Sequence, residues 1–126
     1  MLKRLRIQNF ILIDQLDLPI LSGMTAMTGE TGAGKSILLG ALEAALGRRL
    51  SAKAVLKDKS AKAIIELELV LPDYLEAEFR SKDIDYDTHC VFRRELLPNG
   101  KSRAFINDTP VKSSDLTHFA GQFIDI

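Results

Sequence analysis

The sequence has 126 residues, 46% of them hydrophobic and 27% charged, a composition typical of a single small globular domain. Its 17 basic and 17 acidic residues exclude strong nonspecific attraction of the whole chain to DNA or anionic lipid. The single cysteine, Cys90, excludes an intrachain disulfide. No apolar run has the form of a signal peptide or the length of a membrane span, so we expect a cytoplasmic protein with no membrane partner.

The amino-terminal part of the chain predicts strands followed by a helix. Apolar residues alternate over residues 5–13 and 15–20, which predicts an antiparallel pair near a sheet edge. Residues 23–28, GMTAMT, suit a short buried strand. From Ser36 to Leu46 apolar residues recur at helical spacing, and Gly47 stands where a C-terminal cap is expected. Because apolar residues cover most of this helix, we expect it to be buried.

The central part of the chain has an uneven charge. Residues 48–62 contain six basic residues and one acidic residue, whereas residues 66–87 are acidic. Two solvated faces explain this division better than a binding surface does. Between these charges, residues 63–71 alternate as a strand, and residues 72–81 predict a helix opened by Pro72.

The last third of the chain predicts more strands and one helix. Residues 89–111 contain two strands joined by a turn at 98–100, with a second turn near Asn107 and Asp108. A short helix capped by Ser113 or Ser114 is expected to run through Phe119. Residues 122–126, QFIDI, are predicted to begin one more strand.

Residues 29–36, GETGAGKS, match the pattern G-x-x-x-x-G-K-[ST] and lie between a predicted strand and a predicted helix. Glycines let such a loop curl around a phosphate, while the helix presents its N-terminal N–H groups and positive dipole end to the same anion. Lys35 is expected to act on the β- and γ-phosphates of ATP, as the catalytic residue, and Ser36 to ligate Mg²⁺. The predicted cofactor-binding residues are Gly29, Glu30, Thr31, Gly32, Ala33, Gly34, Lys35 and Ser36.

Other candidate residues give weaker signals. His89 and His118 are far apart, and His89 and Cys90 are adjacent on a predicted strand, so their side chains point to opposite faces and a zinc site is not expected. Asp125 fits either an Mg²⁺-organising acid or an ordinary strand end, and the short apolar run before it favours the strand end. The arginines that could contact phosphate, none singled out by its pattern, are Arg48, Arg49, Arg93, Arg94 and Arg103.

Four stretches carry a family resemblance. The segments LKRLRIQNFILIDQLDL, MTGETGAGKSILLGALEAALGRR, SRAFINDTPV and FIDI resemble, in that order and spacing, the amino-terminal part of the RecN family of bacterial DNA repair proteins, which are SMC-like ATPases. The resemblance spans almost the whole chain and is vague over residues 50–90. One departure is Asp108, which follows Asn107 where relatives often have glycine.

The resemblance implies an α/β fold over residues 1–126, the amino-terminal lobe of an ABC/SMC-type P-loop NTPase head with an additional antiparallel sheet. It implies ATP and Mg²⁺ as cofactors, and ATP hydrolysis coupled to double-strand break repair and recombination in a longer, nucleoid-associated protein. The implied partners are the carboxy-terminal half of the same head, a second head in a homodimer, and DNA.

On this interpretation the chain is a fragment that is inactive by itself and exposes a sheet edge. Two alternatives remain open at this point. One is a small P-loop kinase acting on a nucleotide or metabolite, and the other is a non-catalytic nucleotide-binding interaction module.

Overall fold

The computed structural model describes residues 1–20 and 32–123. Within these ranges the strands form a six-stranded sheet in the order β2-β1-β3-β4-β5-β6, and every neighbouring pair is antiparallel. The strands are β1 (Leu2–Phe10), β2 (Ile13–Pro19), β3 (Ala63–Val70), β4 (His89–Leu96), β5 (Ser102–Ile106) and β6 (Thr109–Val111). The helices are α2 (Gly32–Ala45), α3 (Ala52–Val55), the 3₁₀ turn η1 (Asp73–Leu75), α4 (Glu76–Ser81) and α5 (Ser113–Phe123).

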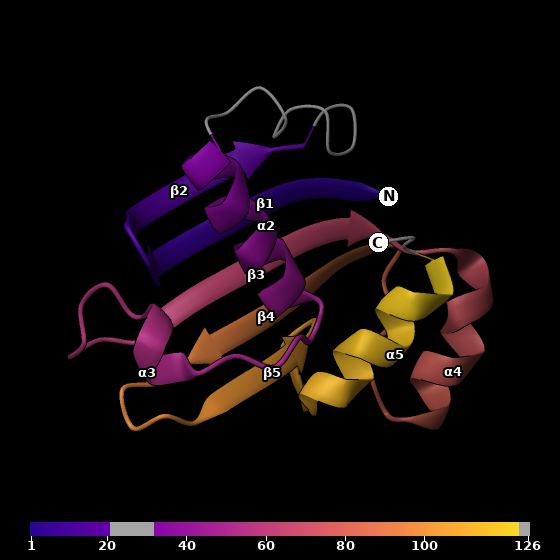
Figure 1. Cartoon of the computed structure of the whole chain (residues 1–126). Helices are drawn as coiled ribbons and strands as arrows, with labels where there is room; N and C mark the ends of the chain where they lie inside the picture. Colours follow the sequence, from indigo (N-terminus) through magenta and orange to yellow (C-terminus); the bar gives the residue numbers. More distant parts are fainter. Residues whose placement is uncertain (21–31, 124–126) are drawn as a thin grey trace.

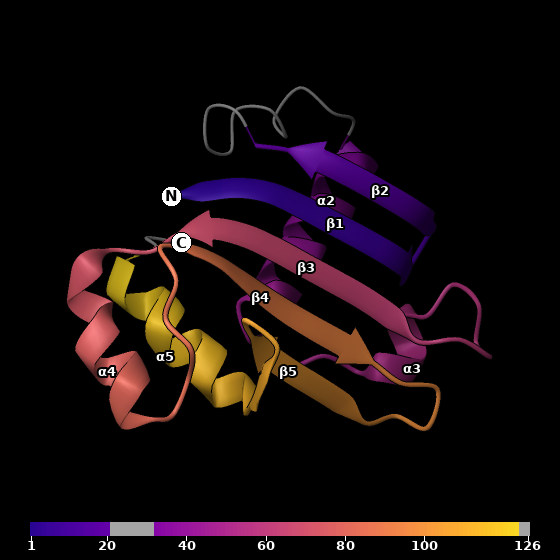
Figure 2. The same ribbon diagram turned by 180° about the vertical axis from the view of Figure 1, so that it is seen from behind.

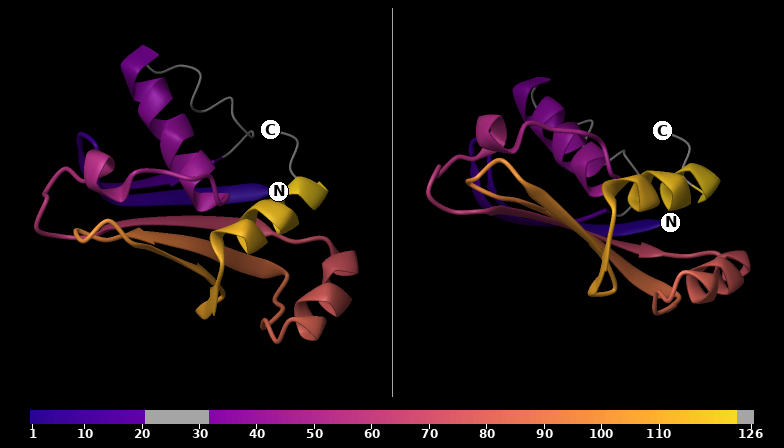
Figure 3. Two further views of the ribbon diagram at one scale, coloured as in Figure 1. Left: turned by 60° about the horizontal axis from the view of Figure 1, so that its bottom comes forward. Right: turned by 90° about the horizontal axis from the view of Figure 1, so that it is seen from below.

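Helices cover one face of the sheet. Helices α2, α3 and α5 lie on the same side, and α2 crosses the strands from the β2 edge toward β4 (Figures 1 and 3). Viewed from behind, the strands stand in front of α2 (Figure 2). Burial follows the two-residue period of the strands: on β3, Ala63, Ile65, Leu67 and Leu69 are buried and their neighbours are partly exposed. The hydrophobic core therefore lies between the sheet and its helices.

The opposite face of the sheet carries paired charges. Arg4 on β1 lies 2.6 Å from Asp17 on β2, and Arg6 lies 2.7 Å from Glu68 on β3. On β4, Glu95 is only 2% exposed and contacts Arg93, with Lys62 at 3.4 Å and Arg103 at 3.7 Å. Ion pairs within β4 and between neighbouring strands therefore offset much of the charge on this face.

Helices α4 and α5 lie side by side at one end of the sheet (Figures 1 and 2). The rings of Phe79 and Phe119 are 4.6 Å apart between centroids, and both side chains are fully buried. Polar contacts flank this pair on the surface: Nε2 of His118 lies 2.5 Å from a carboxylate oxygen of Glu78, and the Tyr74 hydroxyl donates to the Gln122 carbonyl at 2.8 Å. These contacts hold α5 against α4 and the preceding turn η1.

Asn9 ties the first hairpin to the basic segment of residues 48–62. It is 9% exposed and has a positive φ of 55°, a conformation that asparagine tolerates better than most residues. Its side-chain nitrogen donates to the carbonyls of Asp58 and Ala61, and its side-chain oxygen accepts from the Asp58 N–H at 2.6 Å. No local pattern in the sequence marks Asn9 for this role, because its partners lie 49 to 53 positions away.

Most predicted elements are confirmed. The antiparallel pair at a sheet edge, the strand of residues 63–71, the helix after Pro72 and the turn at 98–100 all occur, although the helix after Pro72 begins as a 3₁₀ turn. Asn107 and Asp108 both have positive φ, at 49° and 67°, as a type I′ hairpin turn requires. Asparagine and aspartate therefore supply there the conformation that glycine would give.

Two predictions were wrong in part, and one cannot be compared. Helix α2 begins at Gly32 rather than Ser36, so the second half of the glycine-rich motif belongs to the helix. Helix α5 begins at Ser113 and continues to Phe123, so a strand does not begin at Gln122. Its apolar residues Leu116, Phe119 and Ala120 keep helical spacing and are buried, which outweighs the strand preference of the last residues. The predicted strand at 23–28 lies outside the described residues.

Candidate functional site

The described part of the glycine-rich motif forms the first turn of α2. Gly32, Ala33 and Gly34 are helical and lead directly into Lys35 and Ser36. The first N–H groups of a helix have no intrahelical acceptor and carry a partial positive charge. The first turn of α2 contains no acidic side chain to complement that charge. This end of the helix is therefore suited to an anion.

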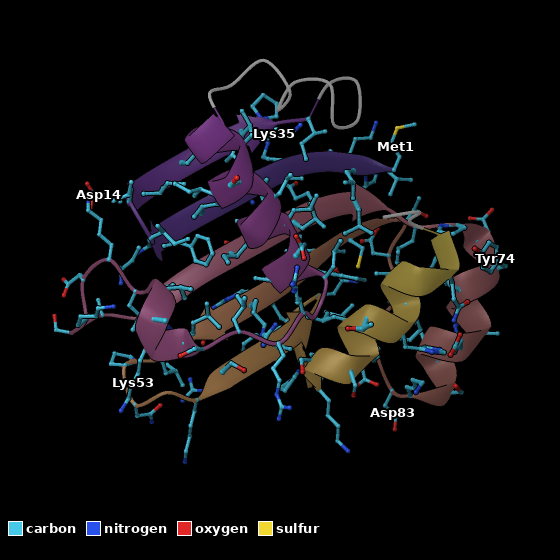
Figure 4. The ribbon with its side chains drawn as sticks, in the orientation of Figure 1. Met1, Asp14, Lys35, Lys53, Tyr74 and Asp83 are labelled. Atoms are coloured by element: carbon cyan, nitrogen blue, oxygen red, sulfur yellow. The ribbon has the colours of Figure 1, made fainter. Side chains whose placement is uncertain are left out.

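Lys35 and Ser36 are both exposed. Figure 4 places Lys35 at the end of α2 near β2, far from Lys53 beside α3. Gly32, Ala33, Gly34, Lys35 and Ser36 thus lie consecutively at the start of one helix, and their roles in binding ATP and Mg²⁺ stay predictions. Gly29, Glu30 and Thr31 lie outside the described residues, so their predicted roles stay predictions.

The other end of α2 is held by a glycine-capped turn. Gly47 has a φ of +96°, the Arg48 N–H donates to the Glu43 carbonyl at 3.0 Å, and the Gly47 N–H donates to the Ala44 carbonyl at 3.1 Å. This is the Schellman arrangement of a helix C-terminus, and it confirms Gly47 as the cap.

Side chains from β4 and α5 add further donors at this end of the helix. One terminal nitrogen of Arg94 donates to the carbonyls of Ala44 at 3.0 Å and Arg48 at 2.9 Å. The Thr117 hydroxyl on α5 lies 3.2 Å from the Leu46 carbonyl and 3.4 Å from the Ser113 carbonyl in its own helix. The C-terminal end of α2 is therefore connected to both the sheet and α5.

The candidate arginines have different roles. Arg94 is 2% exposed and uses its guanidinium on backbone carbonyls and on the Ser102 hydroxyl, so it is not a phosphate ligand. Arg93 and Arg103 contact Glu95, and Arg48 contacts Glu43. Arg49 is exposed beyond the end of α2. The partners of Arg48, Arg93, Arg94 and Arg103 are thus intramolecular, and the first turn of α2 stays the predicted phosphate site.

The described residues hold no group of three or more His, Cys, Asp or Glu side chains that could bind a metal ion. His89 is exposed and Cys90 is buried on the same strand, so they point to opposite faces as predicted. Burial raises the pKa of the Cys90 thiol to about 12, so this cysteine is protonated at neutral pH and is a poor nucleophile. Asp125 lies outside the described residues. None of the described helices is long and apolar enough to cross a membrane.

The sequence is similar to known DNA repair proteins. A family described as an AAA domain matches residues 4–124. DNA repair protein RecN of Haemophilus influenzae is 39% identical over 130 residues, and RecN of Vibrio cholerae is 37% identical over 131 residues. Each match covers 100% of this chain and 23% of the relative, so the chain spans less than a quarter of those proteins.

Solved structures share the fold of this chain. A solved structure from work on ATP-driven dimerization and DNA-stimulated activation of SMC ATPases matches with a TM-score of 0.69 at 24% identity. The match covers 95% of this chain and 77% of that one. The structure therefore has the α/β fold of the amino-terminal lobe of an SMC/ABC-type head, with a six-stranded antiparallel sheet. Taken together, the sequence and the fold show that this chain belongs to the AAA domain family and is a RecN-like amino-terminal region of an ATPase head.

Proposed function

We propose that this chain binds the triphosphate of ATP, together with Mg²⁺, at the first turn of α2. In a longer RecN-like protein, this region takes part in ATP hydrolysis coupled to double-strand break repair and recombination. Its partners there are the carboxy-terminal half of the same head, a second head and DNA, in a cytoplasmic, nucleoid-associated protein. The single observation that carries the proposal is the motif GETGAGKS, whose second half opens a helix.

The residues at the end of α2 fit a nucleotide triphosphate. Backbone N–H groups and the positive end of the helix dipole at a helix N-terminus favour a phosphate, and the first turn of α2 has no acidic side chain that would repel it. Lys35 is exposed at this end, where its ammonium group can reach the β- and γ-phosphates. The Ser36 hydroxyl follows it as the Mg²⁺ ligand, and Mg²⁺, when bound, neutralises charge on the phosphate oxygens.

Calorimetric titration with ATP, in the presence and absence of Mg²⁺, tests the proposal. A charge-assisted hydrogen bond contributes about 1.5–3 kcal/mol, so Lys35→Ala is expected to weaken ATP binding about ten- to a hundredfold. The matched control is Lys53→Ala, since Lys53 is also an exposed helical lysine but lies far from the motif (Figure 4). The control should bind ATP as the parent does. Equal affinity of Lys35→Ala and the parent, with both folded, would refute the assignment.

A further inference from the structure

We propose that Arg94 and Thr117 are positioning residues for the nucleotide site, a proposal that rests on the proposed function. Neither residue is near the glycine-rich motif, which opens α2, in the sequence. Both act on the opposite end of the same helix. Through that end they fix the direction in which α2 presents Lys35 and Ser36.

Arg94 has an unusual position for an arginine. Its side chain is almost fully buried, and its hydrogen-bond partners within the described residues are uncharged oxygens rather than carboxylates. Burying a cation costs free energy unless negative charge lies nearby. The C-terminal carbonyls of a helix carry such charge, and the last turn of α2 has no basic residue of its own. Arg94 therefore supplies from β4 the cation that the helix lacks.

Thr117 and Gly47 fix the same helix end from the side of α5. A Cβ atom on Gly47 would lie 2.4 Å from the Ser113 carbonyl oxygen and 2.4 Å from the Thr117 hydroxyl oxygen, so the two backbones are in direct contact there. The Thr117 hydroxyl lies 3.2 Å from the Leu46 carbonyl at this contact. The C-terminal end of α2 is thus held between β4 and α5.

The two ends of α2 differ in burial. Most buried residues of α2 and its cap lie toward the C-terminal end, namely Ala41, Leu42, Ala44, Ala45 and Leu46, with Leu38 buried nearer the start. Lys35 and Ser36 are exposed, and a Cβ atom on Gly40 would meet no atom within 4 Å. The orientation of α2 is therefore determined mainly near its C-terminus. A helix of 14 residues is about 21 Å long, so a tilt of about 5° at the fixed end moves the other end by about 2 Å. Displacements of that size are large compared with the accuracy that binding sites need.

The test compares Arg94→Met, which removes the charge and its donors, with Phe79→Leu, a core substitution in α4 away from α2. Amide hydrogen exchange over residues 36–41 is measured first in the nucleotide-free chain. The increase in exchange rate over the parent should be about tenfold greater in Arg94→Met than in Phe79→Leu. The two increases are compared under conditions in which both variants have lost the same amount of thermal stability. Arg94→Lys keeps the charge and should restore part of the protection. Equal exchange in Arg94→Met and Phe79→Leu would overturn the proposal.

The affinity for ATP with Mg²⁺ is then measured on the same variants. We expect Arg94→Met to weaken binding about tenfold, and Phe79→Leu to stay within about twofold of the parent, because only the first change moves the binding turn. Unchanged affinity in Arg94→Met also contradicts the proposal. If the parent binds no ATP, the proposed function fails, while the exchange measurement still decides whether Arg94 orders the helix end.

A second variant covers the case in which Arg94→Met does not fold. Thr117→Val removes only the hydroxyl from an exposed position of α5 and keeps the shape of the side chain. It should accelerate exchange over residues 36–41 in the same direction, by about two- to threefold for one lost hydrogen bond. Exchange identical to that of the parent would contradict the role given to Thr117.

Discussion

Two glycines in α2 and its cap give opposite predictions for the same substitution, Gly→Ala. Gly47 has a φ of +96°, and its added Cβ would lie 2.4 Å from the Ser113 carbonyl oxygen. The left-handed conformation costs an alanine about 1–2 kcal/mol, and forced repacking costs about 1–3 kcal/mol, so Gly47→Ala should lower the free energy of unfolding by about 3 kcal/mol. In a domain of this size that corresponds to a loss of about 10 °C in melting temperature.

Gly40 lies within the same helix, and a Cβ atom there meets nothing within 4 Å. Gly40→Ala should therefore raise the free energy of unfolding by about 0.5–1 kcal/mol, because alanine loses less backbone entropy than glycine in a helix. Urea denaturation of both variants and the parent, followed by circular dichroism, measures the two effects. A Gly47→Ala variant as stable as the parent would show that α2 and α5 do not meet as described.

Four further predictions concern the site, the outer sheet face and the rest of the head. In the absence of Mg²⁺, Ser36→Ala should bind ATP with the affinity of the parent, but Mg²⁺ should increase its ATP affinity much less than it does in the parent. An equal increase in the two titrations would argue against Ser36 as the Mg²⁺ ligand. Burial opposes ionisation of Glu95, but its hydrogen bond to Arg93 and the charges of Arg93 and Lys62 outweigh that effect and hold its pKa below the ordinary 4.5. Ionised Glu95 therefore contributes its full stabilising effect above that pH, and the effect is lost as the pH falls through its lower pKa in the folded chain. Glu95→Gln should lower the free energy of unfolding by about 1.5–3 kcal/mol at neutral pH, and that free energy should then fall less on acidification than it does in the parent. Equal falls in the variant and the parent, measured by urea denaturation at several pH values, would exclude Glu95 as the source. The chain alone should show negligible phosphate release from ATP, since the groups that orient the attacking water are expected elsewhere in the head; robust hydrolysis that depends on Lys35 would instead favour a complete small P-loop enzyme such as a kinase. Adding the carboxy-terminal half of a RecN head in trans should raise the melting temperature of the chain, and an unchanged value would argue against that half as a partner.

Short-range patterns predicted much of the fold. The alternation in residues 63–71, the turn at 98–100 and the cap at Gly47 each depend on neighbours a few residues apart, and all three occur. The position of the motif at the start of a helix was predicted for the same reason. The strand expected at residue 122 was wrong because packing of α5 against Phe79 and the sheet outweighs the local preference of the last residues.

Long-range contacts could not be predicted in this way. Arg94 and Ala44 are 50 positions apart, and the residues bonded to the Asn9 side chain lie 49 to 53 positions away. In the sequence, Arg94 is one of several arginines, and only the strand register shows that its side chain points inward beneath α2. Adjacent residues of a strand face opposite sides of the sheet, so one of Arg93 and Arg94 must point toward the core. This can be inferred only after β4 has been assigned.

The central claim is that the triphosphate of ATP binds at the motif that opens α2, and amide chemical shifts locate that binding most directly. A ¹⁵N-labelled chain is titrated with ATP and Mg²⁺, and separately with inorganic triphosphate, which has the same charged groups without the nucleoside. We predict that both ligands shift the amides of residues 29–36 most strongly, and that Lys35→Ala weakens both responses. Largest shifts on the outer sheet face or around α4 and α5, with the motif unaffected, would contradict it.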